Sequence, residues 1–319
     1  MSTLCLIDGH AQLYRAYHAM SQQGFTAPDG RTTGAAYGFT RMLNDLENTL
    51  KPDYLAVVFD SHGPTFRHET YPQYKANRSE TPEDIITQTP MVMTILSLRN
   101  IPVLKIQGWE ADDIIATLAM QSKNEDIEVL IVSGDKDFGQ ILSEGIRLCR
   151  PDKMGKYNLI DAAAFENEWG VKPALIPDLF GLMGDSVDNI PGVPGFGAKI
   201  GAELIRCYKS LEKLLACAHE IKGKRGEVLR ANKTNALLSK QLATIRTDAP
   251  VVFNQEEFAC KAPKIAELRA YYKELGMFSF IRDLNLRYPS TNADDPIPFS
   301  EGQEEDNGES EADNDPMDF

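Results

Sequence analysis

The chain has 319 residues, enough for one large domain or two modest domains with real cores. Hydrophobic residues make up 42% and charged residues 25% of it, and no apolar run approaches the ~20 residues of a membrane span. A charge at Asp8 interrupts the first apolar run, so we expect no secretion signal there. The five cysteines form no CxxC pair, which indicates reduced thiols in a cytoplasmic protein.

The net charge of −14 is concentrated at one end of the chain. Between Tyr288 and Phe319 there are 11 acids and no Lys or Arg, which leaves a net charge of −3 for the remainder. Because residues 288–319 are also poor in apolar side chains, we predict a disordered acidic tail. A nearly neutral body does not exclude nucleic acid, but it requires that the basic residues be grouped locally.

Four apolar runs alternate with amphipathic helical patterns along the first half of the chain. They cover residues 4–7, 54–59, 102–106 and 127–132. This alternation predicts parallel strands covered by helices on both faces, an α/β fold. In such sheets the functional groups gather just beyond the carboxyl ends of the strands.

Carboxylates follow each of these four runs, and two more lie downstream. One acid after a strand is commonly a helix cap, and for Asp8 or Asp112 alone capping is the better explanation. Capping does not explain the whole set, whose members would repel by several kcal/mol without a cation. Oxygen ligands select Mg²⁺ or Mn²⁺, and two or more ions about 4 Å apart would suit phosphodiester hydrolysis. The candidate ligands are Asp8, Asp60, Glu110, Asp112, Asp113, Asp135, Asp137, Asp185 and Asp188.

The segment 184–199, GDSVDNIPGVPGFGAK, joins two of these acids to a glycine-rich hairpin. Gly195 and Gly197 lack the Cβ atoms that would keep a ligand away from the backbone. A helix that starts here directs its unpaired N–H groups at the same place, which suits a phosphate. The plain alternative is a capped helix start preceded by turn aspartates.

The connection 61–100 is the longest in this half and interleaves cations with aromatic rings. Its sequence PTFRHETYPQYKANR suits a single nucleic-acid strand, with phosphates paired and bases stacked. A solvated loop with buried rings explains the same pattern equally well. After it, Thr81 and Pro82 predict a capped helix start, and Pro90 predicts a kink or a division of that helix.

Six ordered motifs resemble the 5′-nuclease domain of bacterial DNA polymerase I, in the flap endonuclease family. They run from about Leu4 to about Leu284 and read LCLIDGHAQLYRAYHA, VVFDSHGPTFRHETYPQYKANR, GWEADDIIATLA, VSGDKDFGQIL, GLMGDSVDNIPGVPGFGAK and LSKQLATIRTD. The resemblance implies a PIN-like core, a helical arch over the active site, and a helix–hairpin–helix element that grips duplex DNA. We therefore predict a catalytic domain at 1–180 with its arch at 61–100, a DNA-binding subdomain at 181–287 and a tail at 288–319.

The resemblance also assigns roles to residues. The family's metal acids fall on the nine candidates above, and its arch cations fall on Lys75 and Arg78. We take Lys75, Arg78, Asp113 and Asp135 as catalytic residues, with K⁺ on the hairpin carbonyls as in the family. The expected DNA contacts are Arg67, Tyr74, Lys75, Arg78, Gly192, Val193, Gly195, Gly197 and Lys199.

The implied activity is Mg²⁺-dependent hydrolysis near 5′ ends, on flaps, nicks, gaps and RNA primers annealed to DNA, in replication and repair. We expect a stand-alone monomer at the nucleoid, because nothing after Leu284 resembles a polymerase. The basic run 222–233, KGKRGEVLRANK, is either a duplex-tracking surface or a solvated helix face. A non-catalytic branched-DNA-binding scaffold and a PIN-type ribonuclease are the alternative functions.

The tail carries two elements, DDPIPF at 294–299 and DPMDF at the terminus, in which Phe follows acids and Pro. Both resemble the acidic, aromatic-ended tip of bacterial single-stranded-DNA-binding proteins. Three interpretations stay open: mimicry of that tip toward a repair or replication protein, an inhibitory tail on the DNA groove, and plain solvation.

Overall fold

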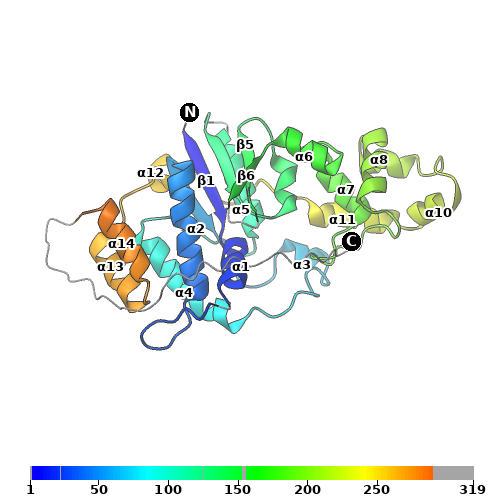
Figure 1. Ribbon diagram of the computed structural model, residues 1–319. Helices are drawn as coiled ribbons and strands as arrows, with labels where there is room; N and C mark the ends of the chain where they lie inside the picture. Colours follow the sequence, from blue (N-terminus) through cyan, green and yellow to red (C-terminus); the bar gives the residue numbers. More distant parts are fainter. Residues whose placement is uncertain (1, 22, 124, 153–155, 290–319) are drawn as a thin grey trace, which may run out of the picture.

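The computed structural model describes residues 2–289 except 22, 124 and 153–155, so the tail beyond residue 289 lies outside the described part. A six-stranded sheet in the order β3-β2-β1-β4-β5-β6 forms the centre (Figure 1). All neighbouring strands are parallel except β6, which is antiparallel to β5. The strands are β1 (Thr3–Asp8), β2 (Tyr54–Val58), β3 (Val103–Leu104), β4 (Glu128–Val132), β5 (Ile146–Pro151) and β6 (Tyr157–Ile160).

The sheet is buried on both faces, as the continuous apolar runs predict. Side chains alternate along β1, so Leu4 and Leu6 join the core on one face while Cys5 and Ile7 join the core on the other. Helix α5 (Ala111–Lys123) covers the first face. Helices α1 (Gly9–Met20), α2 (Gly34–Leu50) and α4 (Glu83–Leu98) cover the second. This confirms the predicted α/β class.

A second group of helices extends the first face toward one end of the molecule (Figure 1). Helix α7 packs on α8, α9 and α11, and the predicted boundary at residue 180 falls inside α7. The group comprises α6 (Ala162–Trp169), α7 (Ile176–Met183), α8 (Ala198–Tyr208), α9 (Leu211–Ala216), α10 (Gly223–Ala231) and α11 (Lys233–Ala243), with short 3₁₀ turns η1 (Lys136–Ile141) and η2 (Pro173–Leu175).

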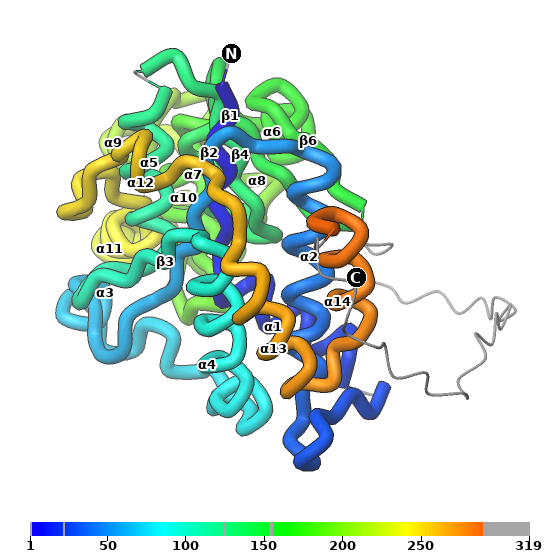
Figure 2. Tube along the Cα trace, turned by 90° about the vertical axis from the view of Figure 1, so that its left-hand side faces the viewer, coloured from blue at the N-terminus to red at the C-terminus, as the bar shows by residue number. Residues whose placement is uncertain are grey.

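The chain then returns to the sheet. After α12 (Gln255–Phe258), helices α13 (Ile265–Glu274) and α14 (Phe278–Arg287) pack with α2 and α4 on the second face (Figure 2). Residues 265–287, which we assigned to the DNA-binding subdomain, therefore lie against the catalytic core. No helix among residues 2–289, the five undescribed residues 22, 124 and 153–155 aside, is long and apolar enough to span a membrane.

The predicted arch consists of a short helix α3 (Phe66–Thr70), a connecting loop and α4. Thr81 does not cap α4: the helix begins at Glu83, Pro82 stands at the N-cap, and the Thr81 hydroxyl accepts a hydrogen bond from Tyr14. Pro90 does not divide the helix either, because the apolar face that carries Ile85 and Ile95 stays packed in the core on both sides of the proline.

Candidate active site

The site lies where the strand order reverses. From β1 the chain passes to β2 on one side, whereas β4 pairs with β1 on the other side. A crevice forms at the carboxyl ends of the strands at such a point. Asp8 is the last residue of β1, Asp60 follows β2, and Asp135 follows β4. The topology therefore brings three of the predicted acids to one place.

A cleft of about 830 Å³ opens at this edge of the sheet. Its floor carries four of the nine predicted acids, namely Asp8, Asp60, Asp112 and Asp135. Lys75 and Arg78 line it from the arch, together with residues of α4. The cleft thus brings acids from the ends of the strands and cations from the arch into one space.

Three of these acids also cap helices. Asp8 accepts hydrogen bonds from the Ala11 amide at 3.0 Å and from the Ser133 hydroxyl at 3.0 Å. Asp60 accepts from the Ala111 amide at 2.7 Å, at the start of α5, and Asp135 caps η1. Capping and site formation are therefore not alternatives here, because each cap fixes the position of a carboxylate at the cleft.

Several carboxylates in and beside the cleft lack enough compensating charge. Burial raises the pKa of Asp8 to about 7, and burial together with Asp135 raises the pKa of Asp137 to about 8. The pKa of Asp112 is also well above its usual value, through burial and then the charges of Asp135 and Asp8. Oδ1 of Asp137 is buried and has no hydrogen-bond partner. A cation would compensate these charges, so the residues fit a hard metal ion.

The two downstream acids stand beside Asp137 and are paired with cations. Lys136 Nζ lies 2.6 Å from Asp185 Oδ2 and 3.8 Å from Asp137 Oδ1. Asp188 forms an ion pair with Arg78 and accepts a hydrogen bond from the Tyr74 hydroxyl at 3.1 Å. Although burial opposes ionisation of Asp188, Lys75 and Arg78 hold its pKa below the usual value.

Glu110 is the acid with the most donors around it. It accepts from Arg67 at 3.2 Å, from the Tyr74 hydroxyl at 3.2 Å and from Lys75 at 3.1 Å, and it is 5% exposed. Burial lowers the pKa of Lys75, but Glu110 and Asp188 raise it further, so its ammonium stays charged.

The base of the arch is fastened to the segment that carries Asp185 and Asp188. The Lys75 amide donates to the Asp188 carbonyl at 2.9 Å, and Asn77 donates to the Ser186 carbonyl at 2.6 Å. Asn189 donates back to the Gln73 carbonyl at 2.7 Å. Lys75 has φ of 57°, an uncommon conformation for a residue with a side chain. These contacts hold Lys75 and Arg78 at the cleft.

The structure does not bring Asp113 into the cleft. Both of its oxygens bind Arg67, at 2.7 and 2.8 Å, and the Arg246 amide donates to it at 2.8 Å. Asp113 is fully buried and Arg67 is 3% exposed. Arg67 also donates to the carbonyls of Leu242 and Thr244. Contrary to our expectation, this pair joins α5 to the second helical group and leaves neither residue facing metal or DNA.

Three other expected DNA contacts also prove to be internal. Tyr74 is 4% exposed, with its hydroxyl held by Glu110 and Asp188, so its ring cannot stack on a base. The Gly192 amide donates to Ser239 and the Val193 amide donates to the Leu182 carbonyl. A Cβ on Gly192 would lie 2.4 Å from the Gly184 nitrogen. Close packing of the two backbone segments therefore explains why a glycine stands at position 192.

The outer part of the hairpin agrees with the prediction. Gly195, Gly197 and Lys199 are exposed, and a Cβ on either glycine would meet nothing within 4 Å. The basic run also reaches solvent, because Lys224 and Arg225 on α10 are exposed. A ligand could approach the backbone at this point.

The nine acids do not form one preassembled cage. Within the described ranges, no three His, Cys, Asp or Glu side chains are gathered closely enough to hold a metal ion. The reason is that Glu110, Asp185 and Asp188 bind protein cations. A metal ion at these acids would therefore have to exchange with Lys75, Arg78 or Lys136.

Sequence reasoning missed three residues of the site. His10 lines the cleft and accepts from the Asp60 amide through Nδ1 at 3.0 Å, and burial lowers its pKa. Ser133 orients Asp8, and Lys136 pairs with Asp185. All three lie inside the quoted motifs, within three residues of a site acid, which was the only available signal.

The fold and the cleft together indicate the class of protein. It is a metal-dependent nuclease in which a group of DNA-binding helices is attached to an α/β core. Residues 3–170 match the domain family described as "5′-3′ exonuclease, N-terminal resolvase-like domain". Residues 171–266 match the family described as "5′-3′ exonuclease, C-terminal SAM fold". The chain belongs to the 5′-3′ exonuclease family and is a nuclease of that family.

Its relatives include DNA polymerase I of Bacillus caldotenax, 38% identical over 92% of this chain and 33% of that protein. DNA polymerase I of Treponema pallidum is 39% identical over 81% of this chain and 26% of that protein. The chain thus spans about a third of the length of these curated relatives or less.

Two solved structures share the fold. The bacteriophage T5 flap endonuclease, in a pseudo-enzyme–product complex with DNA and metal ions, has a TM-score of 0.64 at 20% identity, covering 88% of this chain and 97% of that one. The catalytic core of Rad2 in complex with DNA substrate has a TM-score of 0.61 at 18% identity, covering 90% and 91%.

Proposed function

We propose that this chain hydrolyses phosphodiester bonds near 5′ ends of branched or interrupted DNA, on flaps, nicks, gaps and RNA primers annealed to DNA. The observation that carries the proposal is the cleft itself, which is lined by Asp8, Asp60, Asp112 and Asp135 together with Lys75 and Arg78. A cleft that is lined both by acids, of which Asp8 and Asp112 have raised pKa values, and by fixed cations suits a phosphate ester and divalent cations together.

Divalent ions, for which we propose Mg²⁺, would supply Lewis acidity for the attack of water on phosphorus and charge for the leaving oxygen. Asp8, Asp60, Asp112 and Asp135 would hold them on the floor of the cleft. Asp137, Asp185 and Asp188 form a second group of candidate ligands, linked to the first because Asp135 accepts from the Asp137 amide at 2.8 Å.

The arch cations would bind the substrate phosphate. Lys75 and Arg78 line the cleft and are held there by the loop around Asp188. When the substrate phosphate replaces Asp188 as their partner, the two cations would lie next to the scissile phosphate. There they would stabilise the phosphate as it gains negative charge. Glu110 and Tyr74 position Lys75 and do not contact substrate in this proposal.

The exposed end of the hairpin would hold the duplex. Gly195, Gly197 and Lys199 offer backbone and charge at the start of α8, and Lys224 and Arg225 continue the basic surface on α10. Such contacts to phosphates carry little sequence information, so branched structure would decide where binding occurs. Affinity for duplex should fall as salt rises.

A cleavage assay with matched substrates tests this function. A 5′-labelled DNA flap, a nicked duplex and single-stranded RNA of the same sequence are each incubated with Mg²⁺ or with EDTA. We expect cleavage of the flap and nick near the 5′ end, only with the metal ion. Binding of the flap without cleavage would favour the non-catalytic scaffold, and preferential cleavage of free RNA would favour the PIN-type ribonuclease.

A further inference from the structure

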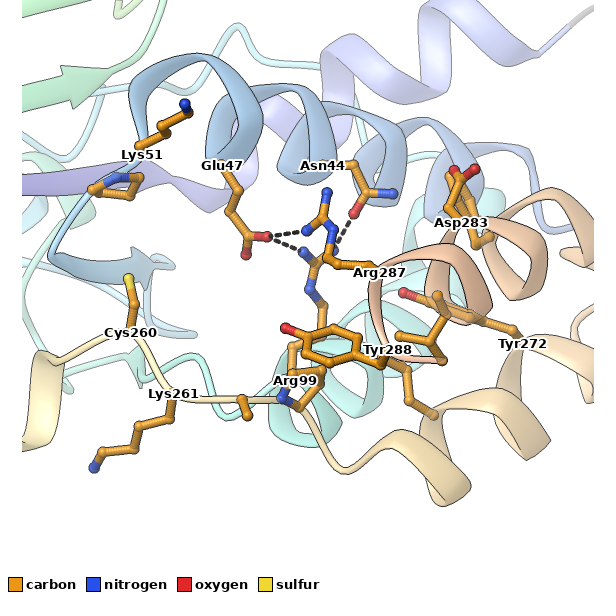
Figure 3. A pocket seen from close by; sticks show the side chains of 16 residues that line it. Asn44, Glu47, Lys51, Arg99, Cys260, Lys261, Tyr272, Asp283, Arg287 and Tyr288 are labelled. Carbon is orange, nitrogen blue, oxygen red and sulfur yellow. Dashed lines mark hydrogen bonds and ion pairs between the residues drawn. The ribbon is translucent and has the colours of Figure 1, made fainter. Parts of the chain in front are cut away.

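A pocket of about 330 Å³ lies between the end of α2 and helices α13 and α14 (Figure 3), and it shares no lining residue with the active-site cleft. Its floor is apolar and aromatic. Leu268, Tyr272, Phe280 and Leu284 contribute to it, and each is at most 8% exposed. The volume is at the lower end of ordinary ligand pockets and suits one large side chain with its neighbours.

The rim of this pocket carries more cations than acids. Arg99 and Arg287 both bind the carboxylate of Glu47, at 2.6 and 3.4 Å, so one negative charge serves two guanidinium groups. Lys51 and Lys261 also line the pocket, and neither has an ion pair within the part of the chain that the structure describes. An aromatic floor below excess positive charge suits a peptide that combines an aromatic ring with carboxylates.

We propose that the pocket receives the C-terminal segment of this same chain, DPMDF at residues 315–319. Phe319 would place its ring on the apolar floor and its terminal carboxylate among the rim cations. Asp318 and Asp315 add two further negative charges. The segment therefore matches the pocket in both apolar and charged character.

The attachment point of the tail supports this choice of occupant. Arg287 and Tyr288 line the pocket, so the chain leaves the described fold at its rim. The 30 residues of 290–319 follow. A random-coil chain of that length has an end-to-end distance of about 30 Å, which is enough to return to its own starting point. Such a tether would keep the segment at millimolar local concentration without any partner.

Docking would have a consequence for the nuclease, and this part rests on the proposed function. The pocket is formed by α13 and α14 at one end of the molecule, whereas α8 and α10 lie at the other end (Figure 1). A docked segment would hold the acidic tail away from the basic surface around Lys224 and Arg225. The tail would then compete less with duplex DNA.

Peptide binding tests the pocket and its occupant together. A fluorescein-labelled ADNDPMDF peptide is titrated, with anisotropy as the readout, into the full chain and into a variant that lacks residues 315–319. We expect the shortened chain to bind at least about tenfold more tightly, because the full chain already fills its pocket. Lys261→Glu in the shortened chain should weaken binding about tenfold, while the matched Lys224→Glu on α10 should not change it.

Each other result overturns the proposal. No binding to the shortened chain would refute the pocket as a site for this segment. Equal binding to both chains would mean that the pocket serves an external acidic peptide rather than this tail. Stronger binding of a labelled DDPIPF peptide would mean that residues 294–299, and not residues 315–319, occupy the pocket. None of these results depends on cleavage, so they are independent of the proposed nuclease function.

A disulfide trap gives a second test in the full chain. Cys260 lines the pocket, whereas Cys207 is exposed on α8, outside it. With Asn314→Cys in a glutathione redox buffer, we expect the new thiol to pair with Cys260 in preference to Cys207. Pairing with Cys207 as often, or pairing only between two chains, would refute docking within the molecule.

Discussion

The pair formed by Asp113 and Arg67 gives the sharpest test of how the structure divides the acids. Asp113 has the sequence context of a metal ligand, yet both its oxygens bind Arg67 and neither residue is more than 3% exposed. Asp113→Asn would leave a buried guanidinium with Glu110 as its remaining carboxylate partner. Breaking a buried ion pair in this way costs about 3–5 kcal/mol, and the remaining partner favours the lower end.

For a fold of this size, about 3 kcal/mol corresponds to a lowering of Tm by roughly 5 °C. Thermal unfolding followed by circular dichroism in EDTA measures it. Asp135→Asn is the matched control, because it removes a charge from the acidic cleft and should leave the metal-free Tm unchanged or raise it. If Asp113→Asn unfolded with wild-type Tm and lost stabilisation by Mg²⁺, Asp113 would be a metal ligand and our assignment would be wrong.

Three further predictions follow from the cleft and the hairpin. Lys75→Ala should lower single-turnover cleavage at least about a hundredfold and flap affinity only a few-fold; the reverse pattern would make Lys75 a binding residue. Because the pKa values of Asp8 and Asp137 are raised to about 7 and about 8 in the fold, metal-free stability should decrease as pH rises from about 4 through 8. Mg²⁺ should therefore raise Tm more at about pH 8 than at about pH 5.5, and equal gains would contradict uncompensated acids. Gly192→Ala should lower Tm strongly, since its Cβ would meet the Gly184 nitrogen at 2.4 Å, whereas Gly197→Ala should leave Tm nearly unchanged and alter duplex binding only.

Much of the fold could be predicted from the sequence because local signals agreed with the global arrangement. The runs that became β1, β2 and β4 are almost continuously apolar, and the first two are followed by helices that cover the sheet, α1 and α4. Strands β5 and β6 were not predicted. In β5, Arg147 and Arg150 interrupt the apolar pattern, and their side chains pair with Glu128 on β4 and Glu168 on α6.

The acids of the site could be predicted from the sequence because the carboxyl ends of parallel strands lie at the same edge of the sheet. What distinguishes Asp113 from Asp112 is not in the sequence, because adjacent helical residues differ in direction by about 100°. Asp112 lines the cleft, and Asp113 turns to Arg67, a partner 46 residues away. Such long-range pairing cannot be deduced from spacing.

The same limit explains the hairpin and the arch. Glycine spacing predicted a backbone that a ligand can approach, and this holds for Gly195 and Gly197, but Gly192 serves close contact with Gly184. Tyr74 looked like a stacking residue because its neighbours are basic. Its burial depends on Glu110 and Asp188, which approach it from two different parts of the chain.

Cleavage of a 5′-labelled flap by Asp135→Asn in Mg²⁺ tests the central claim most directly. Asp135 lines the cleft and its side chain accepts only local hydrogen bonds near the start of η1, so the substitution should not disturb the fold. We predict that cleavage is abolished while flap binding in the same buffer remains measurable. Full cleavage activity in this variant would contradict the assignment of the cleft as the metal-dependent active site.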